Sequence, residues 1–393
     1  MNRRNQNGIN NASSLIIISE FCDGNANSTG FYIEEITKDL AEHAKITVVS
    51  AYINTNLRNH DNVQCHRLKD QARNLQKFIP KKVYRFFQIL FVLKNLDIKN
   101  SSILIGTNPF LLPLLAPILK FLGSKYIVLL CYDFFPVNVL NQTKKSYLYP
   151  IFKAFYYVFR YCYRSCDKVI ACGRDIQNLI VRLKFSNCMS TYYVPNWASQ
   201  GNDLTVARKT FSMVEPRFLF FGNMGRFQAI PQILNQIAHV SNRKAKFIFA
   251  GTGEYASTVR KAAENDSRIE YLGPIPLAQK DEVFSYADIS IISLVPNLKG
   301  CCVPSKLYFS LAANHPVICF VDVGSEVDLL CKEFQCGWNL DFADDFALDT
   351  YIKNFTKKEF LDTYESVRSF PKEVLFGESS LSQLRAILLP PGT

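Results

Sequence analysis

Short apolar runs alternate with amphipathic stretches along the whole chain. Five runs in the first half predict buried strands: Leu15–Ser19, Lys45–Ala51, Ser101–Thr107, Lys125–Tyr132 and Asp167–Ala171. Between the first two runs, Phe31–His43 has helical spacing, with Ile33, Ile36 and Leu40 on one face. Runs that are apolar on both faces are typical of parallel strands covered by helices. The pattern therefore predicts an α/β domain with a parallel sheet.

The same alternation restarts after a polar stretch, residues 198–212, which has the character of a linker. The second half holds five further predicted strands: Arg217–Phe221, Lys246–Ala250, Ile269–Leu272, Asp288–Leu294 and Val317–Val321. We predict two doubly wound, Rossmann-like domains that face each other across a cleft. They span residues 1–200, with residues 1–14 flexible, and residues 201–375. A final helix within residues 376–393 is expected to pack back on the first domain.

The stretch Val303–Asp322 contains the clearest candidate for phosphate binding. Pro304 suits the first position of a helix, so the N–H groups of Ser305 and Lys306 are expected at the positive end of the helix dipole. The Lys306 side chain adds a full positive charge there, and such a helix start can hold a diphosphate. The alternative is an ordinary α/β helix whose Lys306 faces solvent.

A glycine-rich turn in the second half carries another positive candidate. The turn reads Gly222-Asn223-Met224-Gly225-Arg226 and follows a predicted strand. A fixed positive charge at this place can stabilise a diphosphate leaving group while its negative charge grows. A surface arginine in a solvated turn is the alternative interpretation of Arg226.

Two strand ends in the first half are candidates for ligand contact. Asp133 follows a predicted strand, at the edge where parallel sheets place ligands, although a helix cap or a turn would explain it equally well. The loop before the first predicted helix contains Gly24 and Ser28-Thr29-Gly30, and its glycines allow a ligand to approach the backbone closely.

Composition places the chain among globular proteins of a reducing compartment. Its 48% hydrophobic and 20% charged residues support full cores. The 12 cysteines show no C-x-x-C pair and no paired Cys/His spacing, which argues against a zinc site and suits the cytoplasm. The polar start holds no signal peptide, and no apolar run is long enough to span a bilayer.

Positive charge is concentrated in the first half. Residues 1–200 hold 25 Lys and Arg against 12 Asp and Glu, a net charge of +13, whereas the remainder holds 20 against 22, a net charge of −2. Two segments, Lys144–Lys168 and Lys81–Lys94, interleave basic and aromatic residues, which suits the headgroup region of an anionic bilayer. Core helices with a few exposed lysines are the alternative. No nucleic-acid module accompanies the charge, so nucleic acid is not an expected partner.

Motifs spread over most of the chain carry a family resemblance: Ser28-Thr29-Gly30, Tyr132-Asp133-Phe134-Phe135-Pro136, Val194-Pro195-Asn196-Trp197, Gly222-Asn223-Met224-Gly225-Arg226, Gly251-Thr252-Gly253-Glu254, Val303-Pro304-Ser305-Lys306-Leu307-Tyr308 and Ala312-Ala313-Asn314-His315-Pro316-Val317. Together they resemble the retaining glycosyltransferases of family 4, which have the GT-B fold. The resemblance is nearest to members that build bacterial surface polysaccharides of the O-antigen, capsule and colanic-acid type. The last two motifs are the most specific.

The resemblance implies that the second domain binds a nucleotide-diphosphate sugar and that the first takes the acceptor. The implied donor-binding residues are Gly222, Asn223, Gly225, Arg226, Gly251, Gly253, Glu254, Pro304, Ser305, Lys306, Leu307 and Glu326. Catalytic roles are implied for Asp133, Arg226 and Lys306, and an acceptor or phosphate loop for Ser28, Thr29 and Gly30. No metal ion or other cofactor is expected.

The chain departs from the family pattern at two places. Many members carry two glutamates eight positions apart, where this chain has Cys301 and Phe309. Many also pair the arginine with a lysine five residues later, where this chain has Pro231. We hypothesise that Lys306 supplies the missing charge and that Glu326 offers a carboxylate to the sugar or the nucleotide.

We therefore expect a cytoplasmic glycosyltransferase that is peripheral on the inner face of the cell membrane. It would move a hexosamine or deoxy-hexosamine from a nucleotide-diphosphate donor to a lipid-linked saccharide acceptor, a polyprenyl diphosphate, with retention at the anomeric carbon. The alternatives are a nucleotide-sugar epimerase of the same architecture and a catalytically inactive sugar-nucleotide-binding or scaffold protein.

Overall fold

The computed structural model describes residues 14–70, 79–144, 147–199, 211–276 and 279–389. The chain forms two compact units: the first comprises Met1–Pro195, Gly300–Cys302 and Ser379–Thr393, and the second Asn196–Lys299 and Val303–Glu378. The first unit thus takes up a short loop and the end of the chain from the second half of the sequence. Nearly all of the expected flexible start and most of the expected linker lie outside the described residues.

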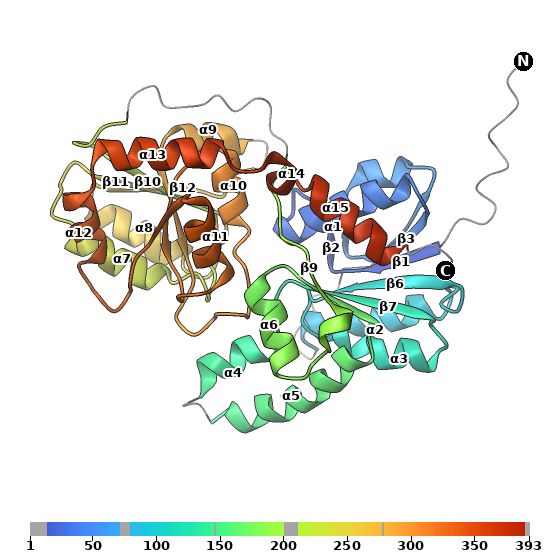
Figure 1. The fold of residues 1–393 in the computed structure, drawn as a ribbon. Coiled ribbons are helices and arrows are strands. Elements are labelled where there is room, and N and C mark those ends of the chain that lie inside the picture. Colours follow the sequence, from blue (N-terminus) through green and yellow to red (C-terminus); the bar gives the residue numbers. More distant parts are fainter. Residues whose placement is uncertain (1–13, 71–78, 145–146, 200–210, 277–278, 390–393) are drawn as a thin grey trace, which may run out of the picture. The chain divides into compact units, whose positions relative to one another are not determined.

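The described part of the first unit is built on a seven-stranded sheet with the order β5-β3-β1-β6-β7-β8-β9 (Figure 1). Its strands are β1 (Ser14–Ile18), β3 (Lys45–Ser50), β5 (Val63–Arg67), β6 (Ser101–Gly106), β7 (Tyr126–Cys131), β8 (Lys168–Ala171) and β9 (Thr191–Tyr193). All neighbouring strands are parallel. A separate parallel pair, β2 (Phe21–Cys22) with β4 (Tyr52–Ile53), extends the ends of β1 and β3.

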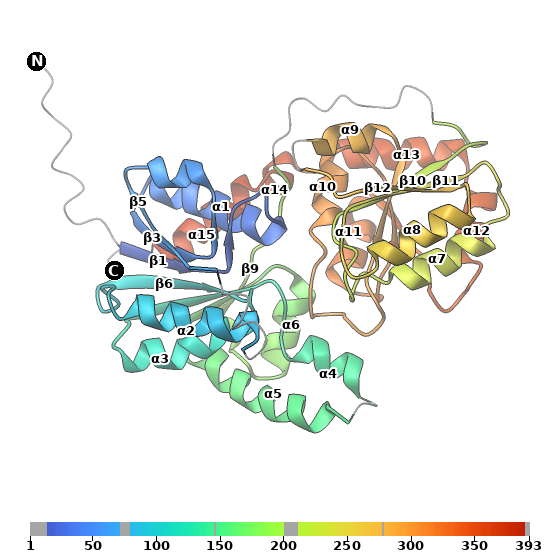
Figure 2. The ribbon, with the colours of Figure 1, turned by 180° about the vertical axis from the view of Figure 1, so that it is seen from behind.

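The helices of this unit are α1 (Ser28–Ala41), α2 (Lys81–Leu93), α3 (Leu115–Phe121), α4 (Val137–Thr143), α5 (Tyr149–Arg164), α6 (Arg174–Arg182) and α15 (Glu378–Leu388). Figures 1 and 2 both show α2, α3 and α5 lying side by side. The final helix α15 contacts the first, because Arg385 lies 3.4 Å from the carboxylate of Asp39 on α1. Within the described ranges, no helix has the length and apolar character needed to cross a bilayer.

The described part of the second unit contains a six-stranded parallel sheet with the order β12-β11-β10-β13-β14-β15. Its strands are β10 (Arg217–Phe221), β11 (Lys246–Ala250), β12 (Ile269–Gly273), β13 (Ile289–Ser293), β14 (Val317–Phe320) and β15 (Gly337–Asn339). Its helices are α7 (Ile230–His239), α8 (Ala256–Asn265), α9 (Lys280–Ser285), α10 (Lys306–Ala312), α11 (Glu326–Phe334), α12 (Ala347–Asn354), α13 (Lys357–Arg368) and α14 (Lys372–Leu375). Both units are therefore doubly wound α/β folds, as predicted.

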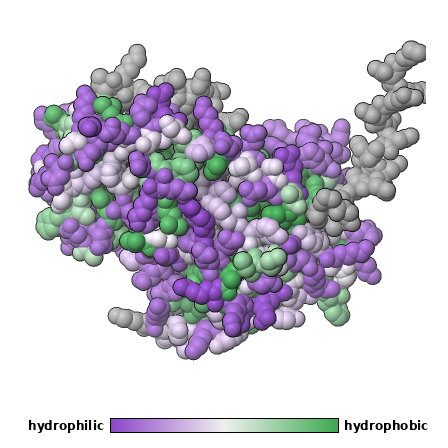
Figure 3. Space-filling view, in the orientation of Figure 1, coloured by the Kyte–Doolittle hydropathy of each residue, from purple (hydrophilic) through white to green (hydrophobic). Residues whose placement is uncertain are grey.

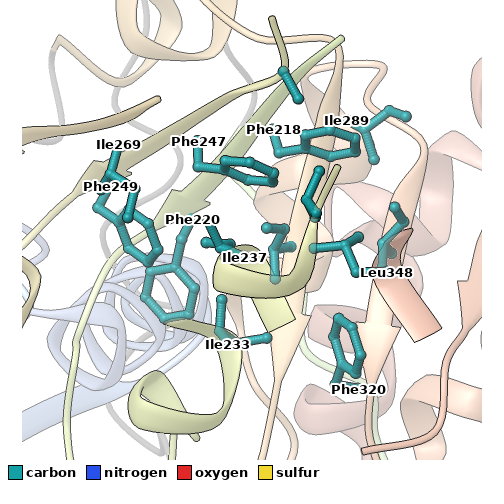
Figure 4. Close-up of a cluster of buried hydrophobic side chains, with 14 of the residues drawn as sticks. Phe218, Phe220, Ile233, Ile237, Phe247, Phe249, Ile269, Ile289, Phe320 and Leu348 are labelled. Carbon is teal, nitrogen blue, oxygen red and sulfur yellow. The ribbon is translucent and has the colours of Figure 1, made fainter. Parts of the chain in front are cut away.

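Paired phenylalanines hold the core of the second unit together. Phe218 on β10 lies opposite Phe247 on β11, with ring centroids 5.2 Å apart, and Phe220 lies 5.7 Å from Phe249 in the same way. The pairs share one face because side chains alternate along a strand. Ile237 of α7 belongs to the same buried cluster (Figure 4). Burying each such ring stabilises the fold by roughly 2–3 kcal/mol.

The predicted strands of the second half agree closely with the structure, and β10 and β11 match residue for residue. The first helix is different, because α1 begins at Ser28 rather than Phe31. Asn27 caps it, and its side-chain oxygen accepts a hydrogen bond from Gly30 N at 2.8 Å. Ser28, Thr29 and Gly30 therefore form the first turn of a helix and not an open loop.

Candidate active site

Two glycine turns meet at the carboxyl edge of the second sheet. After β10, Gly222 N donates to Ala250 O at 2.8 Å, and Met224 N donates to Thr252 O at 2.7 Å. Tyr255 N, after β11, donates back to Met224 O at 3.0 Å. The two predicted turns thus form one hydrogen-bonded layer of backbone, at the edge where open α/β sheets bind ligands.

Glycine is required at two positions of this layer. Gly251 has φ +144°, and a Cβ atom built on it would overlap the carbonyl of Gly222. Gly253 has φ +147°, and a Cβ atom there would lie 2.6 Å from the carbonyl carbon of Met224. The left-handed backbone and the close approach each exclude a larger residue. The turns can therefore approach one another only because both residues are glycine.

Arg226 lies at the rim of the glycine layer. Its Nε atom is 3.5 Å from Glu254 Oε2, so the structure brings together two of the residues expected at the donor. Their side chains are 74% and 51% exposed, and an ion pair in water contributes little to stability. The guanidinium is thus accessible to a ligand, and its planar fork suits two phosphate oxygens.

The helix α10 begins at Lys306, two residues after the expected start at Pro304, and the Lys306 amine points inward. Nζ lies 3.5 Å from the ring centroid of Phe220, and the residue is only 7% exposed. It makes no hydrogen bond to any described residue, and burial lowers the pKa of Lys306 well below its usual range. Lys306 is therefore neither an open positive charge at the helix start nor a lysine that faces solvent.

The other residues expected around this helix differ in their exposure. Pro304 and Leu307 are buried. Ser305, the residue before α10, is half-buried. Glu326 is the first residue of α11 and is 1% exposed. The positive end of the helix dipole favours its carboxylate there.

Asp133 lies at the carboxyl edge of the first sheet, directly after β7. Its backbone N donates to Thr107 Oγ1 at 3.2 Å, and it forms an isolated antiparallel bridge with Cys302, which belongs to the same unit. The next helix, α4, has Pro136 as its N-cap and no side-chain cap, so Asp133 does not serve as the cap. The sequence analysis did not single out Thr107, whose hydroxyl fixes the Asp133 backbone.

The electrostatic environment of Asp133 suits proton exchange near neutral pH. Its side chain is exposed, so water reaches the carboxylate. Desolvation by neighbouring protein atoms nevertheless raises the pKa of Asp133 to about 6, and the positive charge of Lys82 on α2 opposes this rise. A carboxylate with such a pKa at a ligand-binding edge is a candidate catalytic group.

Two N–H groups of the expected phosphate loop of the first unit already have partners within that unit. Gly30 N is bound to Asn27, and Gly24 N donates to the Glu34 carboxylate at 2.8 Å. Glu34 is 6% exposed and also accepts from the Asn54 amide at 3.1 Å. The N–H groups of Gly24 and Gly30 are therefore already bonded within the first unit, Gly24 to a buried carboxylate of α1, and they do not face an anion.

Where many family members have two glutamates, this chain has a buried thiol and a buried phenyl ring. Cys301 is fully buried, and Asn141 Nδ2 lies 3.6 Å from its sulfur, while Phe309 is 6% exposed within α10. Across the described residues, no three His, Cys, Asp or Glu side chains gather as a set of metal ligands. All twelve cysteines are free thiols.

Comparison with known proteins connects this geometry to a family. No family model matches the sequence. Probable glycosyltransferase WbjE of Pseudomonas aeruginosa is 31% identical over 380 residues, which cover 92% of this chain and 93% of that protein. Identity at this level over nearly the whole of both proteins shows the family.

Solved structures show the same fold at low sequence identity. Anabaena HepE, in complex with UDP, has a TM-score of 0.68 at 12% identity, covering 95% of this chain and 98% of that one. WaaG, a glycosyltransferase involved in lipopolysaccharide biosynthesis, has a TM-score of 0.69 at 10% identity, covering 96% and 100%. The chain belongs to the glycosyltransferase family of WbjE and has the GT-B fold.

Proposed function

We propose that this glycosyltransferase moves a hexosamine or deoxy-hexosamine from a nucleotide-diphosphate donor to a lipid-linked saccharide, in surface-polysaccharide synthesis, with retention. The observation that carries the proposal is the layer of paired glycine turns with the accessible Arg226 at its rim. UDP in the HepE structure and the biosynthetic role of WaaG support a nucleotide donor and a polysaccharide pathway. The second unit would hold the donor.

In this proposal, Arg226 acts on the leaving group. Negative charge grows on the diphosphate as the glycosidic bond breaks, so a fixed guanidinium stabilises the transition state more than the bound donor. Lys306 has a supporting role, because its amine packs on the face of Phe220 in the strand that leads into the glycine turn. No metal ion is part of the proposed reaction.

Asp133 is proposed to orient the acceptor. In its ionised form the carboxylate accepts a hydrogen bond from the acceptor hydroxyl and holds it for attack. Asp133→Asn is expected to lower turnover about a hundredfold. The melting temperature should stay unchanged, because the Asp133 side chain makes no hydrogen bond to a described residue. A large fall in melting temperature would assign Asp133 a structural role instead.

We further propose that the protein rests on the inner face of the cell membrane. The layer of α2, α3 and α5 exposes large apolar side chains: Phe87, Phe91, Phe121, Ile151, Tyr157 and Tyr161. In Figure 3, green hydrophobic residues lie among purple hydrophilic ones in the lower part of the view, where α4 and α5 lie. Aromatic side chains among basic residues suit anionic headgroups, and the first 200 residues carry the positive charge.

One assay separates the candidate functions. Purified protein is incubated with a panel of nucleotide sugars, with and without a polyprenyl-diphosphate saccharide, and the products are identified by mass spectrometry and NMR. We expect acceptor-dependent transfer and a product that keeps the anomeric configuration of the donor. Conversion without acceptor would indicate an epimerase, and no conversion of any donor would indicate a scaffold. Equal binding to anionic and neutral vesicles at low salt would contradict the membrane proposal.

A further inference from the structure

Four neighbouring strands of the first sheet lead to a group of side chains that the proposed transfer does not use, apart from Asp133. In the order β3-β1-β6-β7, the strands are followed by Tyr52, Phe21, Phe110 and Asp133. Because these strands are parallel and adjacent, their carboxyl ends lie at one edge of the sheet. The topology therefore gathers residues that are far apart in the sequence.

The aromatic members of this group are held in place by packing. Phe21 and Tyr52 are paired residues of β2 and β4, and their rings are stacked with centroids 4.9 Å apart and planes 10° apart. The Phe110 ring centroid lies 4.5 Å from that of the buried Phe135. Phe21, Tyr52 and Phe110 are each half-buried, so every ring keeps part of its surface in solvent. The edge thus presents fixed aromatic surfaces.

Two lysines at the start of α2 complete the group. Lys81 Nζ donates to Tyr52 OH at 3.0 Å, and Lys82 Nζ lies 5.1 Å from the ring centroid of Phe110. Both lysines are exposed, and neither forms an ion pair with a described residue. Lys82 is near enough to Asp133 for its charge to oppose the rise in the pKa of that carboxyl. Two adjacent ammonium groups without a bound carboxylate can pair with an anionic ligand.

We propose that this lysine–aromatic cluster, formed by Lys81, Lys82, Tyr52, Phe21 and Phe110, binds the diphosphate and first sugar of the acceptor. The proposal rests on the transfer function proposed above. Lysine is a point-charge partner for phosphate oxygens, and two of them match the two phosphates. Aromatic faces cover the apolar face of a sugar ring, as they cover other apolar groups. Asp133 at the same edge then meets a hydroxyl of that sugar.

The nucleotide donor also contains a glycosyl diphosphate. The exposed apolar side chains of α2 favour the lipid-linked acceptor as the ligand of the cluster. The helix continues from Lys82 to Phe87 and Phe91, which are 62% and 69% exposed. At 1.5 Å and about 100° per residue, they lie roughly 8 and 14 Å from Lys82 along the helix axis and about 140° and 180° around it. A prenyl chain that leaves the diphosphate therefore has to pass around α2 to reach these exposed apolar side chains, which belong to the helix that provides the lysines.

The test measures binding of a lipid-linked probe in the absence of donor and of vesicles. The probe is N-acetylglucosamine diphosphate carrying a short prenyl chain, used below its micelle concentration in titration calorimetry with the full chain. The K81Q/K82Q double variant is expected to bind the probe at least tenfold more weakly, and Tyr52→Ala several-fold more weakly. The matched control is Lys99→Gln, which removes the same type of charge from an exposed lysine just before β6, at the other edge of the sheet. The affinity of Lys99→Gln for the probe should stay within twofold of that of the wild type.

A second arm with UDP-N-acetylglucosamine distinguishes the two sources of the glycosyl diphosphate. The affinity for UDP-N-acetylglucosamine should be the same in the wild type and in the double variant. Loss of UDP-sugar binding in the double variant would assign the cluster to the donor and overturn the proposal. Failure of the wild type to bind the probe at millimolar concentration would also overturn it, as would an equal loss in Lys99→Gln. Equal melting temperatures show that the variants are folded.

The transfer assay keeps this proposal separate from the proposed function. If the wild type glycosylates a lipid acceptor and the double variant binds the probe and reacts as well as wild type, the cluster assignment is wrong and the transfer function stands. If the wild type transfers nothing but binds the probe through Lys81 and Lys82, the transfer function is wrong and the binding site stands.

Discussion

The carboxyl edges of the two sheets differ in the groups that form them. In the second unit, the edge after β10 and β11 is made of backbone, with Gly251 and Gly253 packed against the preceding turn and Arg226 at the rim. In the first unit, the edge after β3, β1, β6 and β7 is made of side chains, among them Tyr52 and Lys82. One edge is fixed by hydrogen bonds between turns, and the other by stacking of rings.

This difference matches the two kinds of substrate in the proposed reaction. A backbone edge has one geometry, which suits the invariant diphosphate of a nucleotide donor. A side-chain edge combines charge with apolar surface, which suits an acceptor that is anionic, sugar-bearing and lipid-linked at once. The charge distribution agrees, since the net charge of +13 falls in the first 200 residues.

Gly251→Ala should give the largest effect, because it breaks the backbone edge. The new Cβ would overlap the Gly222 carbonyl, and φ +144° is unfavourable for alanine. We expect a loss of about 3 kcal/mol in stability and no measurable donor binding. Gly273→Ala is the matched control, since Gly273 has φ +76° but no atom near its Cβ position. It should cost only about 1 kcal/mol and keep donor binding. Equal melting curves and equal affinities for the two variants would contradict the close packing of the turns.

Arg226→Ala should cut turnover about a hundredfold, which corresponds to about 3 kcal/mol of transition-state stabilisation. Its effect on stability should stay below about 0.5 kcal/mol, because the pair with Glu254 is exposed. Arg226→Lys should recover only part of the rate, since the planar fork is lost. Steady-state kinetics with thermal melts check this. Normal turnover in Arg226→Ala would make Arg226 a solvated surface residue.

The second unit should lose stability in acid through His315. This residue is 5% exposed, its Nδ1 lies 3.1 Å from Ser290 Oγ, and Phe284 packs against its ring. Burial lowers the pKa of His315 to about 4. The unfolded chain, with a His pKa near 6.5, binds the extra proton first. The stabilising contribution is therefore complete above about pH 6.5 and falls as the pH drops to 4, by about 3 kcal/mol in total.

Chemical denaturation between pH 7 and pH 4 measures this dependence. His315→Gln should flatten the acid limb. An acid limb that survives in His315→Gln would assign the effect to other groups.

Lys306→Met should have the smallest effect. Methionine keeps the length of the side chain over Phe220 but removes the buried amine, so the second unit should be as stable as wild type or about 1 kcal/mol more stable. Turnover should stay within about threefold if Lys306 acts only through packing. A hundredfold fall in turnover at an unchanged melting temperature would show that the charge of Lys306 acts on the donor.

The sequence was sufficient to predict the two α/β units, most strands and the glycine turns. Local apolar runs predict strands such as β10. Glycines predict turns, because only glycine readily adopts the backbone conformations found there. The direction of the Lys306 side chain could not be predicted, because it depends on where Phe220 lies in the sheet. Local pattern shows that a helix forms here but not which side chains pack beneath it.

The lysine–aromatic cluster was hidden from sequence analysis for a similar reason. In the sequence, Lys81 and Lys82 belong to a segment with the pattern of a membrane contact, and Tyr52 is almost 30 residues away from them in the chain. Their meeting depends on the pairing of β2 with β4 and on the position of α2. The hydrogen bond from Gly24 N to Glu34 was hidden in the same way. In the sequence, Glu34 is one acidic residue of an amphipathic helix, and nothing near it indicates this contact.

A crossed binding experiment measures whether each edge binds its own substrate. UDP and the prenyl-linked glycosyl diphosphate are each titrated into wild type, Arg226→Ala and K81Q/K82Q at constant ionic strength. We expect Arg226→Ala to weaken UDP binding and leave the lipid-linked probe unaffected, and the double variant to do the reverse. If either variant weakens the binding of both ligands equally, the backbone edge and the side-chain edge do not bind separate substrates.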